Sequence, residues 1–313
     1  MKIATILALS AFLLPLLTFA AGIHLENSRD LADGEYKVCF IGDSGDGSLN
    51  QYMVASGVAD EGCHQVRHLG DIIYSAGVKS AHSIKTYTRF RWPYRRIFKS
   101  KHKPQMYMSV GNHDYKKNPK AWIDLAKKHK NVTMPSLYYS DFWNDICFFT
   151  LDTMDKGPVQ NKWFEARKAE SKKNCKFTVA YGHHPYISSG RSAAKGESKK
   201  WYEKHIVGQV DMFLAGHDHH VAYEGAVSGT HFFVSGAGGH GLRPVSGTRA
   251  GGYAVEDFGY ITLTFNRLES GQIESEYKIY TVKRRKSWYQ LFKKGGVIRT
   301  LRHSGKLLGH GIR

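Results

Sequence analysis

The stretch HLGDIIYS, residues 68–75, ends an apolar run on Gly70-Asp71 and places Tyr74 three residues after the aspartate. An apolar run that stops at a glycine and an acidic residue is typical of a strand followed by a turn. Similar runs are YKVCFIGD, PQMYMSVGNHD, DICFFTLDT, KFTVAYGHHP and VDMFLAGHDHH. Stretches with helical periodicity lie between them, and this alternation predicts an α/β layered fold.

After residue 230 the pattern changes to strands alone, in THFFVSGAGG, DFGYITLTFN and ESEYKIYTV. We therefore expect a second, largely antiparallel sheet packed on the first. The chain is 42% hydrophobic and 23% charged, which excludes a disordered protein. The sequence shows no internal repeat and no long linker. Residues 21–282 are therefore predicted to form one domain, and residues 283–313 a basic tail that follows it.

The chain starts with a basic residue, an apolar core and small residues, which is typical of a signal peptide. We expect cleavage near Ala20, so that residues 1–20 are removed and the protein is exported to a periplasm or secreted. A membrane anchor is the alternative, because the apolar run is near the short end of what spans a bilayer.

Export makes disulfides the expectation for the four cysteines. If the strands of each pair are neighbours, Cys39 pairs with Cys63 and Cys147 pairs with Cys175. Four cysteines allow three pairings, and free thiols are the alternative.

Polar side chains gather at the ends of the predicted strands, where ligands bind in open α/β sheets. They are Asp43, Asp71, Tyr74, Asn112, His113, His183, His217 and His219. Carboxylate, phenolate, amide oxygen and imidazole ligands suit iron, zinc or manganese better than copper(I), and they outnumber the ligands of one tetrahedral zinc. The sequence therefore predicts two metals. Taken singly, each residue has an alternative role as a turn residue, a helix cap or a solvated loop histidine.

Five motifs occur in order: GDSG at residue 42, GDIIY at 70, GNHD at 111, GHHP at 182 and GHDH at 216. They resemble the motifs of the calcineurin-like metallophosphoesterases and, more narrowly, of the small, tartrate-resistant type of purple acid phosphatase. The resemblance runs from about Lys37 to about Ile279. It implies a four-layer α-β-β-α sandwich of two mixed sheets flanked by helices.

The resemblance also gives Tyr74 a role. Many metallophosphoesterases begin with D-x-H, whose histidine helps to hold the first metal, but here Asp43 is followed by Ser44 and Gly45. In purple acid phosphatases the tyrosine of G-D-x-x-Y takes over that role, and Tyr74 stands at its position. A phenolate is a hard anionic ligand that favours Fe(III), and the alternative for Tyr74 is a buried aromatic beside the sheet.

Carried over position by position, the resemblance implies two metal ions and one catalytic histidine. The ferric ion would be held by Asp43, Asp71, Tyr74 and His219. Asp71 would bridge to a divalent ion, which is Fe, Zn or Mn, held by Asn112, His183 and His217. His113 would lie over the phosphate and stabilise it or protonate the leaving alkoxide.

Two positions depart from the family pattern. Ser44 stands where the family often has tryptophan, which affects the wall of the site but no ligand. Ser192 stands where related enzymes have a loop histidine, which leaves the second proton donor open. Arg191 beside it is either a ligand of a phosphate oxygen or a solvated loop residue.

The formal net charge of +18 at pH 7 indicates that the protein has an anionic partner. Specific nucleic-acid binding is not expected, because no recognised binding motif accompanies the charge. In residues 283–313, ten Lys or Arg occur without Asp or Glu, and a short helix from Ser287 would place Trp288, Leu291 and Phe292 on one side. This pattern favours contact with an anionic membrane or another polyanion. A solvated tail, or one that docks back on the enzyme, is the alternative.

Together these features predict an exported binuclear-metal acid phosphatase that hydrolyses phosphate monoesters by attack of a metal-bound hydroxide. Alternatives are a phosphodiesterase or phospholipid phosphatase on the same metals, and a non-catalytic protein that binds polyanionic surfaces. The sequence names neither the natural substrate nor the oligomeric state.

Overall fold

A computed structural model describes residues 23–27, 35–285, 287, 289 and 292–312. The predicted signal peptide, residues 1–20, lies outside them, as do Trp288 and Leu291 of the helix predicted from Ser287. Among the described residues, none of the helices has the length and apolar character needed to cross a bilayer.

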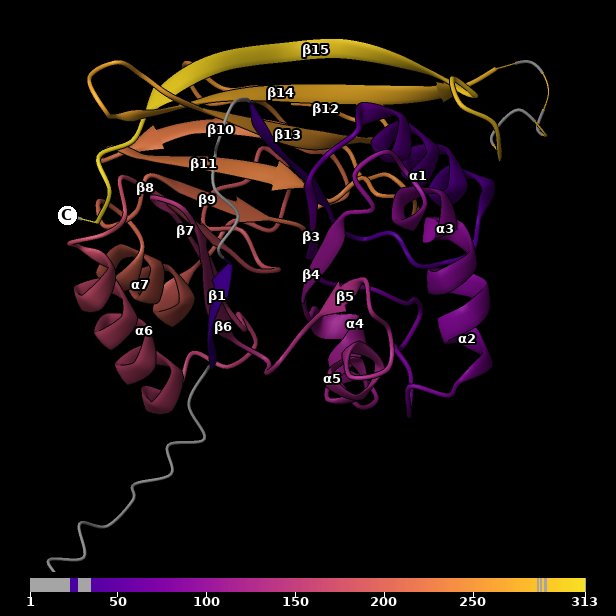
Figure 1. The fold of residues 1–313 in the computed structure, drawn as a ribbon, viewed down its shortest axis with the longest axis horizontal. Helices are drawn as coiled ribbons and strands as arrows, with labels where there is room; N and C mark the ends of the chain where they lie inside the picture. Colours follow the sequence, from indigo (N-terminus) through magenta and orange to yellow (C-terminus); the bar gives the residue numbers. More distant parts are fainter. Residues whose placement is uncertain (1–22, 28–34, 286, 288, 290–291, 313) are drawn as a thin grey trace, which may run out of the picture.

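Two mixed sheets pack face to face (Figure 1). The seven-stranded sheet contains, in spatial order, β15 (Val297–Leu308), β14 (Ile273–Arg284), β13 (Gly259–Arg267), β2 (Tyr36–Ile41), β3 (Gln65–Leu69), β4 (Gln105–Ser109) and β5 (Val132–Thr133). The eight-stranded sheet contains β1 (Ile23–Asn27), β6 (Tyr139–Trp143), β7 (Ile146–Thr150), β8 (Phe177–Tyr181), β9 (Met212–Ala215), β11 (Thr230–Ser235), β10 (Val221–Val227) and β12 (Tyr253–Val255).

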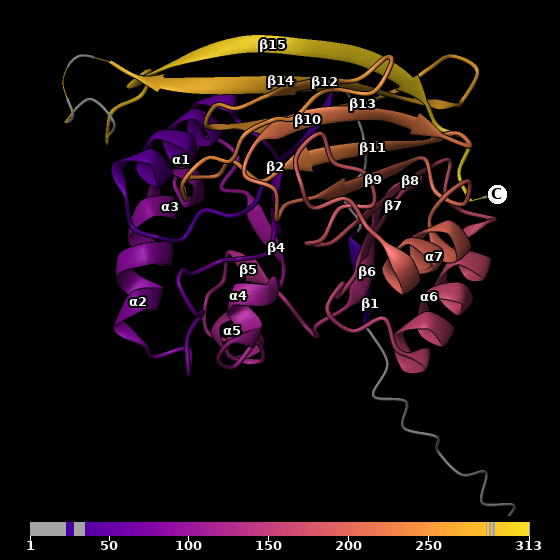
Figure 2. The same ribbon diagram turned by 180° about the vertical axis from the view of Figure 1, so that it is seen from behind.

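Helices cover the outer face of each sheet, as Figures 1 and 2 show from opposite sides. The seven-stranded sheet is flanked by α1 (Leu49–Glu61), α2 (Ile84–Thr86), the π-helical turn η1 (Tyr87–Arg91), α3 (Trp92–Phe98), α4 (Asn112–Tyr115) and α5 (Ala121–Ala126). The eight-stranded sheet is flanked by α6 (Pro158–Ser171) and α7 (Gly196–His205). The predicted four-layer α-β-β-α sandwich of two mixed sheets is thus confirmed.

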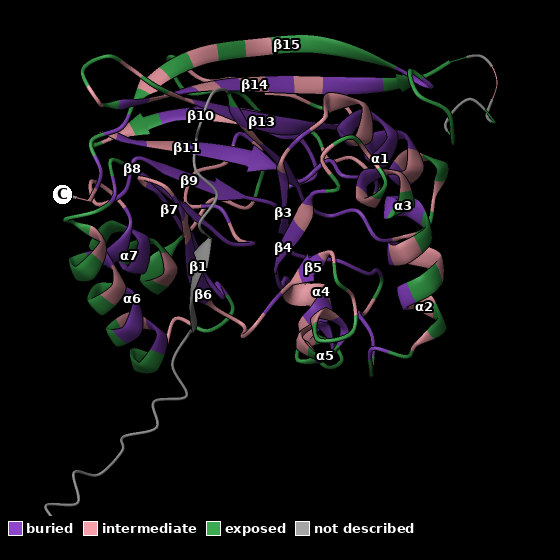
Figure 3. Cartoon of the chain, in the orientation of Figure 1, coloured by how far each residue is buried: buried purple, intermediate pink, exposed green. Residues whose placement is uncertain are grey.

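Three apolar cores separate the four layers. One lies between α1, α3 and the seven-stranded sheet, one between the two sheets, and one between the eight-stranded sheet and α6 and α7. Central strands such as β3 are buried along their whole length because they are covered on both faces. Figure 3 shows these buried strands between helices whose outer faces are exposed.

The strands after residue 230 do not form a separate antiparallel sheet, so that expectation was wrong. β11 and β12 extend the eight-stranded sheet, whereas β13, β14 and β15 extend the seven-stranded sheet from β2. Inward side chains such as Ile261, Leu263 and Phe265 of β13 fill the core between the sheets. The late strands pair at the open edges of both sheets because those edges offer unpaired main-chain groups next to this core.

Part of the segment expected to be a basic tail is a strand. β15 pairs antiparallel with β14, with Val297 opposite Arg284, and Val282 lies inside β14. Most side chains of β15 are exposed, so main-chain pairing rather than an apolar face holds the strand. Phe292, just before it, packs against Tyr52 of α1 with ring centroids 5.6 Å apart.

Both expected disulfides are present and confirmed. Cys39 of β2 is bonded to Cys63, just before β3, and Cys147 of β7 is bonded to Cys175, just before β8. Each therefore joins two neighbouring parallel strands.

A buried ion pair joins the two sheets. The Arg67 guanidinium on β3 donates two hydrogen bonds of 2.7 Å to the two carboxylate oxygens of Asp141 on β6. Both side chains are fully buried, and the guanidinium also lies 3.7 Å from the ring centroid of Phe148 on β7. This bidentate pair fixes the seven-stranded sheet against the eight-stranded sheet.

We predict that Asp141→Asn lowers the free energy of unfolding by about 3–5 kcal/mol, because it leaves the Arg67 cation buried without its anion. Urea unfolding followed by circular dichroism measures the change. Asp124→Asn, which removes the exposed partner of Lys127, is the control and should change it by less than about 1 kcal/mol. If both variants lower the free energy of unfolding equally, the buried ion pair stabilises the protein no more than an exposed one does.

Candidate metal centre

All eight residues singled out in the sequence follow the ends of strands that pair in parallel, six of them on loops and Asn112 and His113 at the start of α4. Asp43 follows β2, Asp71 and Tyr74 follow β3, and Asn112 and His113 follow β4, all in the seven-stranded sheet. The other three face them from the eight-stranded sheet: His183 after β8, and His217 and His219 after β9. The carboxyl ends of strands from both sheets therefore meet at one place.

The Tyr74 hydroxyl is the centre of one group of side chains. It donates to Asp43 Oδ1 at 2.7 Å and Asp71 Oδ2 at 3.0 Å, and it lies 3.2 Å from His219 Nε2. All four side chains are buried. The residues expected to hold one metal ion are thus brought within contact of one another.

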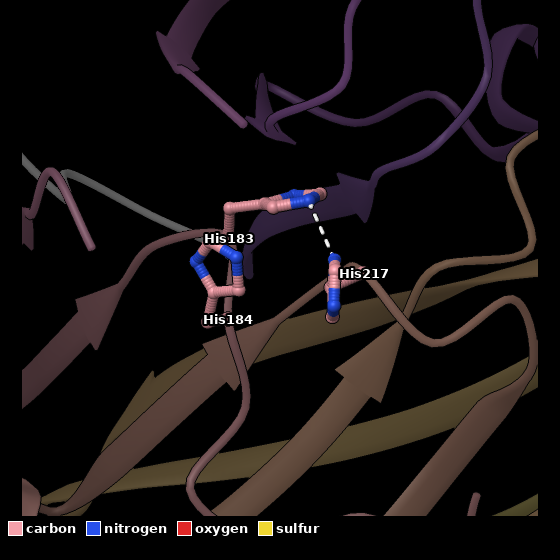
Figure 4. A group of neighbouring side chains, drawn as sticks. All are labelled: His183, His184 and His217. Carbon is pink, nitrogen blue, oxygen red and sulfur yellow. Dashed lines mark hydrogen bonds between the residues drawn. The ribbon is translucent and has the colours of Figure 1, made fainter. Parts of the chain in front are cut away.

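The His183 imidazole is the centre of a second group. Its Nε2 lies 3.1 Å from Asn112 Oδ1 and 3.2 Å from His217 Nδ1. The same atom is 3.4 Å from Asp71 Oδ2, the oxygen that accepts from Tyr74. Figure 4 shows the His183 and His217 rings turned toward each other. Asp71 is therefore the residue that the two groups share.

His113 lies at the more open side of these groups, with its side chain 18% exposed. Its main-chain N–H donates to Asp71 Oδ1 at 2.7 Å, and its Nε2 lies 3.9 Å from Asp71 Oδ2. The ring Nδ1 is hydrogen-bonded to the Ser75 carbonyl, so Nδ1 carries a proton and Nε2 faces the site.

The backbone of these loops is unusual. Asp43, Asp71 and His217 have φ values of 56°, 50° and 69°, a left-handed conformation that non-glycine residues seldom adopt. Two motif glycines allow the close approach of neighbouring loops: a Cβ at Gly111 would collide with the Asp71 carboxylate, and one at Gly216 with the Asp43 carboxylate. Such strained backbone is kept where it positions functional side chains.

Charges in the site strongly affect one another. Burial raises the pKa of Asp43 and of Asp71, but the charge of His183 and the hydrogen bonds that the two carboxylates accept together outweigh it, and both carboxyls end with a lowered pKa. Burial lowers the pKa of His183, but Asp71 and Asp43 outweigh it and raise it to about 9. Burial and the two carboxylates raise the pKa of the Tyr74 phenol. In the protein alone, protons on Tyr74 and His183 therefore offset the buried negative charge.

These donors fit a pair of cations. Ligand atoms of Asp43, Asp71 and His183 lie within 4.8 Å of one another, and so do those of His183, His184 and His217. The first group is rich in anionic oxygen, which suits a trivalent ion, and the second is rich in imidazole, which suits a divalent ion. Metal cations bound there would replace the protons on Tyr74 and His183 that offset the negative charge of Asp43 and Asp71.

Two histidines at the site were not predicted as part of it. His184 stands beside His183 and His217, and its Nδ1 lies 2.9 Å from the Thr153 hydroxyl; GHHP offered it only as a neighbour of the expected ligand. His240 stacks on Tyr74 with ring centroids 3.7 Å apart. Its position in VSGAGGHG gave no signal, because the contact joins segments far apart in the sequence.

The two departures from the family pattern have structural partners. The Ser44 hydroxyl is buried, lies 2.9 Å from His68 Nε2 and contacts the Tyr94 hydroxyl. The Ser192 hydroxyl donates to Asp218 Oδ1 at 2.7 Å, and its main-chain N–H donates to Asp218 Oδ2 at 2.9 Å. Ser192 therefore anchors its loop instead of facing the donor groups.

The sequence model of the calcineurin-like phosphoesterases matches residues 36–221, which include every residue of both donor groups. The chain belongs to the calcineurin-like phosphoesterase family. The resemblance inferred from the five motifs is thereby confirmed.

Curated relatives of this phosphoesterase-family chain are tartrate-resistant acid phosphatases of type 5. The rabbit protein (Oryctolagus cuniculus) is 25% identical over 206 residues, which is 56% of this chain and 62% of the relative. The human protein (Homo sapiens) is 23% identical over 269 residues, which is 73% of this chain and 81% of the relative. The match with the rabbit relative thus spans less than two thirds of its length.

Two solved structures share the fold of this phosphoesterase-family chain. One is described as GAP50, the anchor in the inner membrane complex of Plasmodium, with a TM-score of 0.68, 18% identity, and coverage of 88% of this chain and 90% of the other. The second is the purple acid phosphatase PPD1 from yellow lupin (Lupinus luteus) seeds, with a TM-score of 0.59, 18% identity, and coverage of 88% and 54%.

We predict that His68, buried behind Asp43, makes the metal-free protein less stable in acid. Burial lowers the pKa of His68 to about 4, below its unfolded value near 6.5. Unfolding therefore binds a proton between these pH values, and the free energy of unfolding falls by up to about 1.4 kcal/mol for each pH unit as the pH drops. Urea unfolding of chelator-treated protein from pH 7 to 4 measures this slope.

The variant His68→Gln should reduce that slope, because glutamine does not titrate. His310→Gln, at an exposed position, is the control and should keep the slope of the parent protein. If His68→Gln has the same pH dependence as the parent, His68 is not a neutral buried histidine.

Proposed function

We propose that this protein is a binuclear-metal acid phosphatase that hydrolyses phosphate monoesters. The observation that carries the proposal is Asp71 Oδ2, which lies 3.0 Å from the Tyr74 hydroxyl and 3.4 Å from His183 Nε2. One carboxylate is thus placed to serve two neighbouring donor groups. The relatives that are acid phosphatases support the same chemistry.

In this proposal the ligands divide between an Fe(III) ion and a divalent ion, which is Fe, Zn or Mn. The ferric ligands are Asp43, Asp71, Tyr74 and His219, and the divalent ligands are Asp71, Asn112, His183 and His217. When bound, such a pair supplies positive charge for the phosphate and acidifies water at moderately low pH.

In this proposal His113 contacts the phosphate and protonates the leaving group. With Nδ1 bonded to Ser75, its Nε2 lies at the open side of the site, between Asp71 and the Lys116 ammonium, which is 3.4 Å away. A phosphate ester that approaches Asp71 from this side would meet Nε2, which can stabilise the phosphate and protonate the departing alkoxide. Its main-chain hydrogen bond to Asp71 keeps the imidazole in place.

The proposal includes export. Residues 1–20 have the pattern of a signal peptide, and the two disulfides support an oxidising compartment, a periplasm or the extracellular space.

Contact of residues 283–313 with an anionic membrane or another polyanion is also a proposal. The exposed Leu301 and Leu308 and the exposed Arg302 of β15 support it. Arg299 and Lys306, however, pair with Glu61 and Glu274, which reduces the charge that the strand presents.

We predict that Tyr74→Phe abolishes the visible absorption band of the iron-loaded protein, because that band requires charge transfer from a phenolate to Fe(III). Absorption spectra together with iron content by mass spectrometry measure the effect. Tyr87→Phe, away from the site, is the control and should keep the band. A band that persists in Tyr74→Phe would refute the assignment of this tyrosine.

We predict that His113→Ala keeps its metals but loses turnover by roughly tenfold to ten-thousandfold, the range expected for the loss of a general acid. The loss should be larger for an alkyl phosphate than for nitrophenyl phosphate, whose leaving group needs no proton. His310→Ala serves as the control. Equal losses on the two substrates would rule out the role of His113 in leaving-group protonation.

Hydrolysis of nitrophenyl phosphate compared with its bis-nitrophenyl diester, from pH 4 to 8, tests the function itself. Preference for the monoester on the acidic side supports the phosphatase. Preference for the diester would favour a phosphodiesterase, and no hydrolysis by protein that carries both metals would favour the non-catalytic alternative.

A further inference from the structure

A basic pocket of about 680 Å³ lies beside α3, and we call it the α3 pocket. Six cationic side chains line it: Arg91, Arg95, Lys99, Lys103, Lys128 and Lys130. They come from η1, α3, the loop that leads into β4 and the loop that leads into β5. The metal centre follows the carboxyl end of β4, so the α3 pocket lies at the opposite end of this strand, about 17 Å away by strand length.

The walls of the α3 pocket are held together by the fold. The rings of Phe98 and His129 also line it and contact each other, with centroids 4.9 Å apart. The Asn131 side-chain amide donates to the Lys103 carbonyl at 3.4 Å, and the Met106 main-chain N–H donates to the Asn131 carbonyl at 2.8 Å. These bonds join the two loops, so the main chain that carries the pocket's lysines is held in place before any ligand arrives.

The charge of the α3 pocket is not balanced within the described part of the chain. No acidic residue lines it, and none of its six cations forms an ion pair with a described carboxylate. Cationic residues next to those of the pocket do form ion pairs: Arg96 on α3 pairs with Asp60, and Lys127 pairs with Asp124. Arg91 Nε is buried without a described hydrogen-bond partner. Like charges held around one hollow repel one another, and an anionic ligand would relieve this.

Shape and residue type indicate which anion fits. Arg91, Arg95 and Lys99 are spaced four residues apart, so they project from one side of the η1 and α3 helical segment. Arginine pairs with phosphate oxygens through two hydrogen bonds, and lysines add point charges around it. A hollow of about 680 Å³ has the size of a small-molecule site rather than of an extended nucleic-acid track.

We propose that the α3 pocket binds a molecule that carries several phosphate groups close together, either free in solution or as the head group of a lipid. This site is separate from the metal centre, and it does not depend on the proposed phosphatase activity. The guanidinium of Arg95 also lies 5.5 Å from the Phe292 ring centroid.

The test compares two double variants that change the net charge equally. Lys99→Glu with Lys128→Glu reverses two charges of the α3 pocket, and Lys172→Glu with Lys173→Glu reverses two exposed charges after α6, on the other side of the molecule. The protein is made in a host without N-glycosylation, because Asn131 at the pocket is part of an Asn-Val-Thr sequon. Equal melting temperatures establish that both variants are folded.

Two probes distinguish the source of the phosphates. Inositol hexakisphosphate is titrated by calorimetry, and vesicles of phosphatidylcholine with phosphatidylinositol bisphosphate are used in co-sedimentation. We expect the parent protein to bind at least one probe, the pocket variant to bind it roughly tenfold to a hundredfold more weakly, and the control variant to bind it within about twofold. Binding of the soluble probe alone assigns a free ligand, and displacement from vesicles by that probe assigns a head group.

The proposal is overturned if the parent protein binds neither probe, or if both double variants lose affinity equally, since the attraction would then come from net charge alone. Tighter binding of single-stranded DNA with the same dependence on Lys99 and Lys128 would also overturn it. If the pocket variant does not fold, Lys99→Gln with Lys128→Gln replaces it and must weaken binding by at least about threefold. The Tyr74→Phe spectrum does not enter this test, so each proposal can fail without the other.

Discussion

The buried ion pair between Arg67 and Asp141 is the contact on which the arrangement of the site depends. Neither sheet carries a complete set of donors: Asp43, Asp71 and Tyr74 belong to one sheet, and the histidines after β8 and β9 belong to the other. Their atoms lie close together only if the two sheets keep one relative position. Arg67 lies on β3, four residues before Asp71, and is bound to the opposite sheet by two hydrogen bonds. The Arg67–Asp141 ion pair therefore joins the two sheets close to the place where the candidate metal ligands meet.

This arrangement buries negative charge, which is unfavourable in free energy. Two carboxylates taken out of water cost several kcal/mol each unless they are compensated. In the protein alone the compensation comes from His183, from the Tyr74 hydroxyl and from main-chain N–H groups such as that of His113. The left-handed backbone at Asp43, Asp71 and His217 and the close approach of Gly111 and Gly216 hold the charges in spite of this cost. A site that keeps such strain is organised for cations rather than for its own stability.

The positive charge of the chain is distributed unevenly. In β15, Arg299 and Lys306 are paired with carboxylates of α1 and β14, so part of the basic segment serves the fold. The six cations that line the α3 pocket lack such partners among the described residues and surround a hollow instead. A formal charge of +18 therefore does not mean a uniformly attractive surface. The position of the unpaired cations, more than their number, indicates where an anion would bind.

The sequence by itself determined the family, the layered α/β class and eight of the residues that meet at the candidate site, and it favoured, without settling, the two disulfide pairings that the structure contains. It could do so because a strand that ends on Gly-Asp or Gly-His has a local signature, and because five such signatures in order are specific. The tertiary structure decided the rest. It placed β11 and β12 in one sheet and β13 to β15 in the other, since an edge is chosen by the core beside it and by free main-chain groups. It made β15 a strand through pairing with β14, although its side chains show no apolar face. It brought His240 onto Tyr74, and Lys99 and Lys128 to one pocket, because contacts between distant segments depend on packing and leave no pattern in the local sequence.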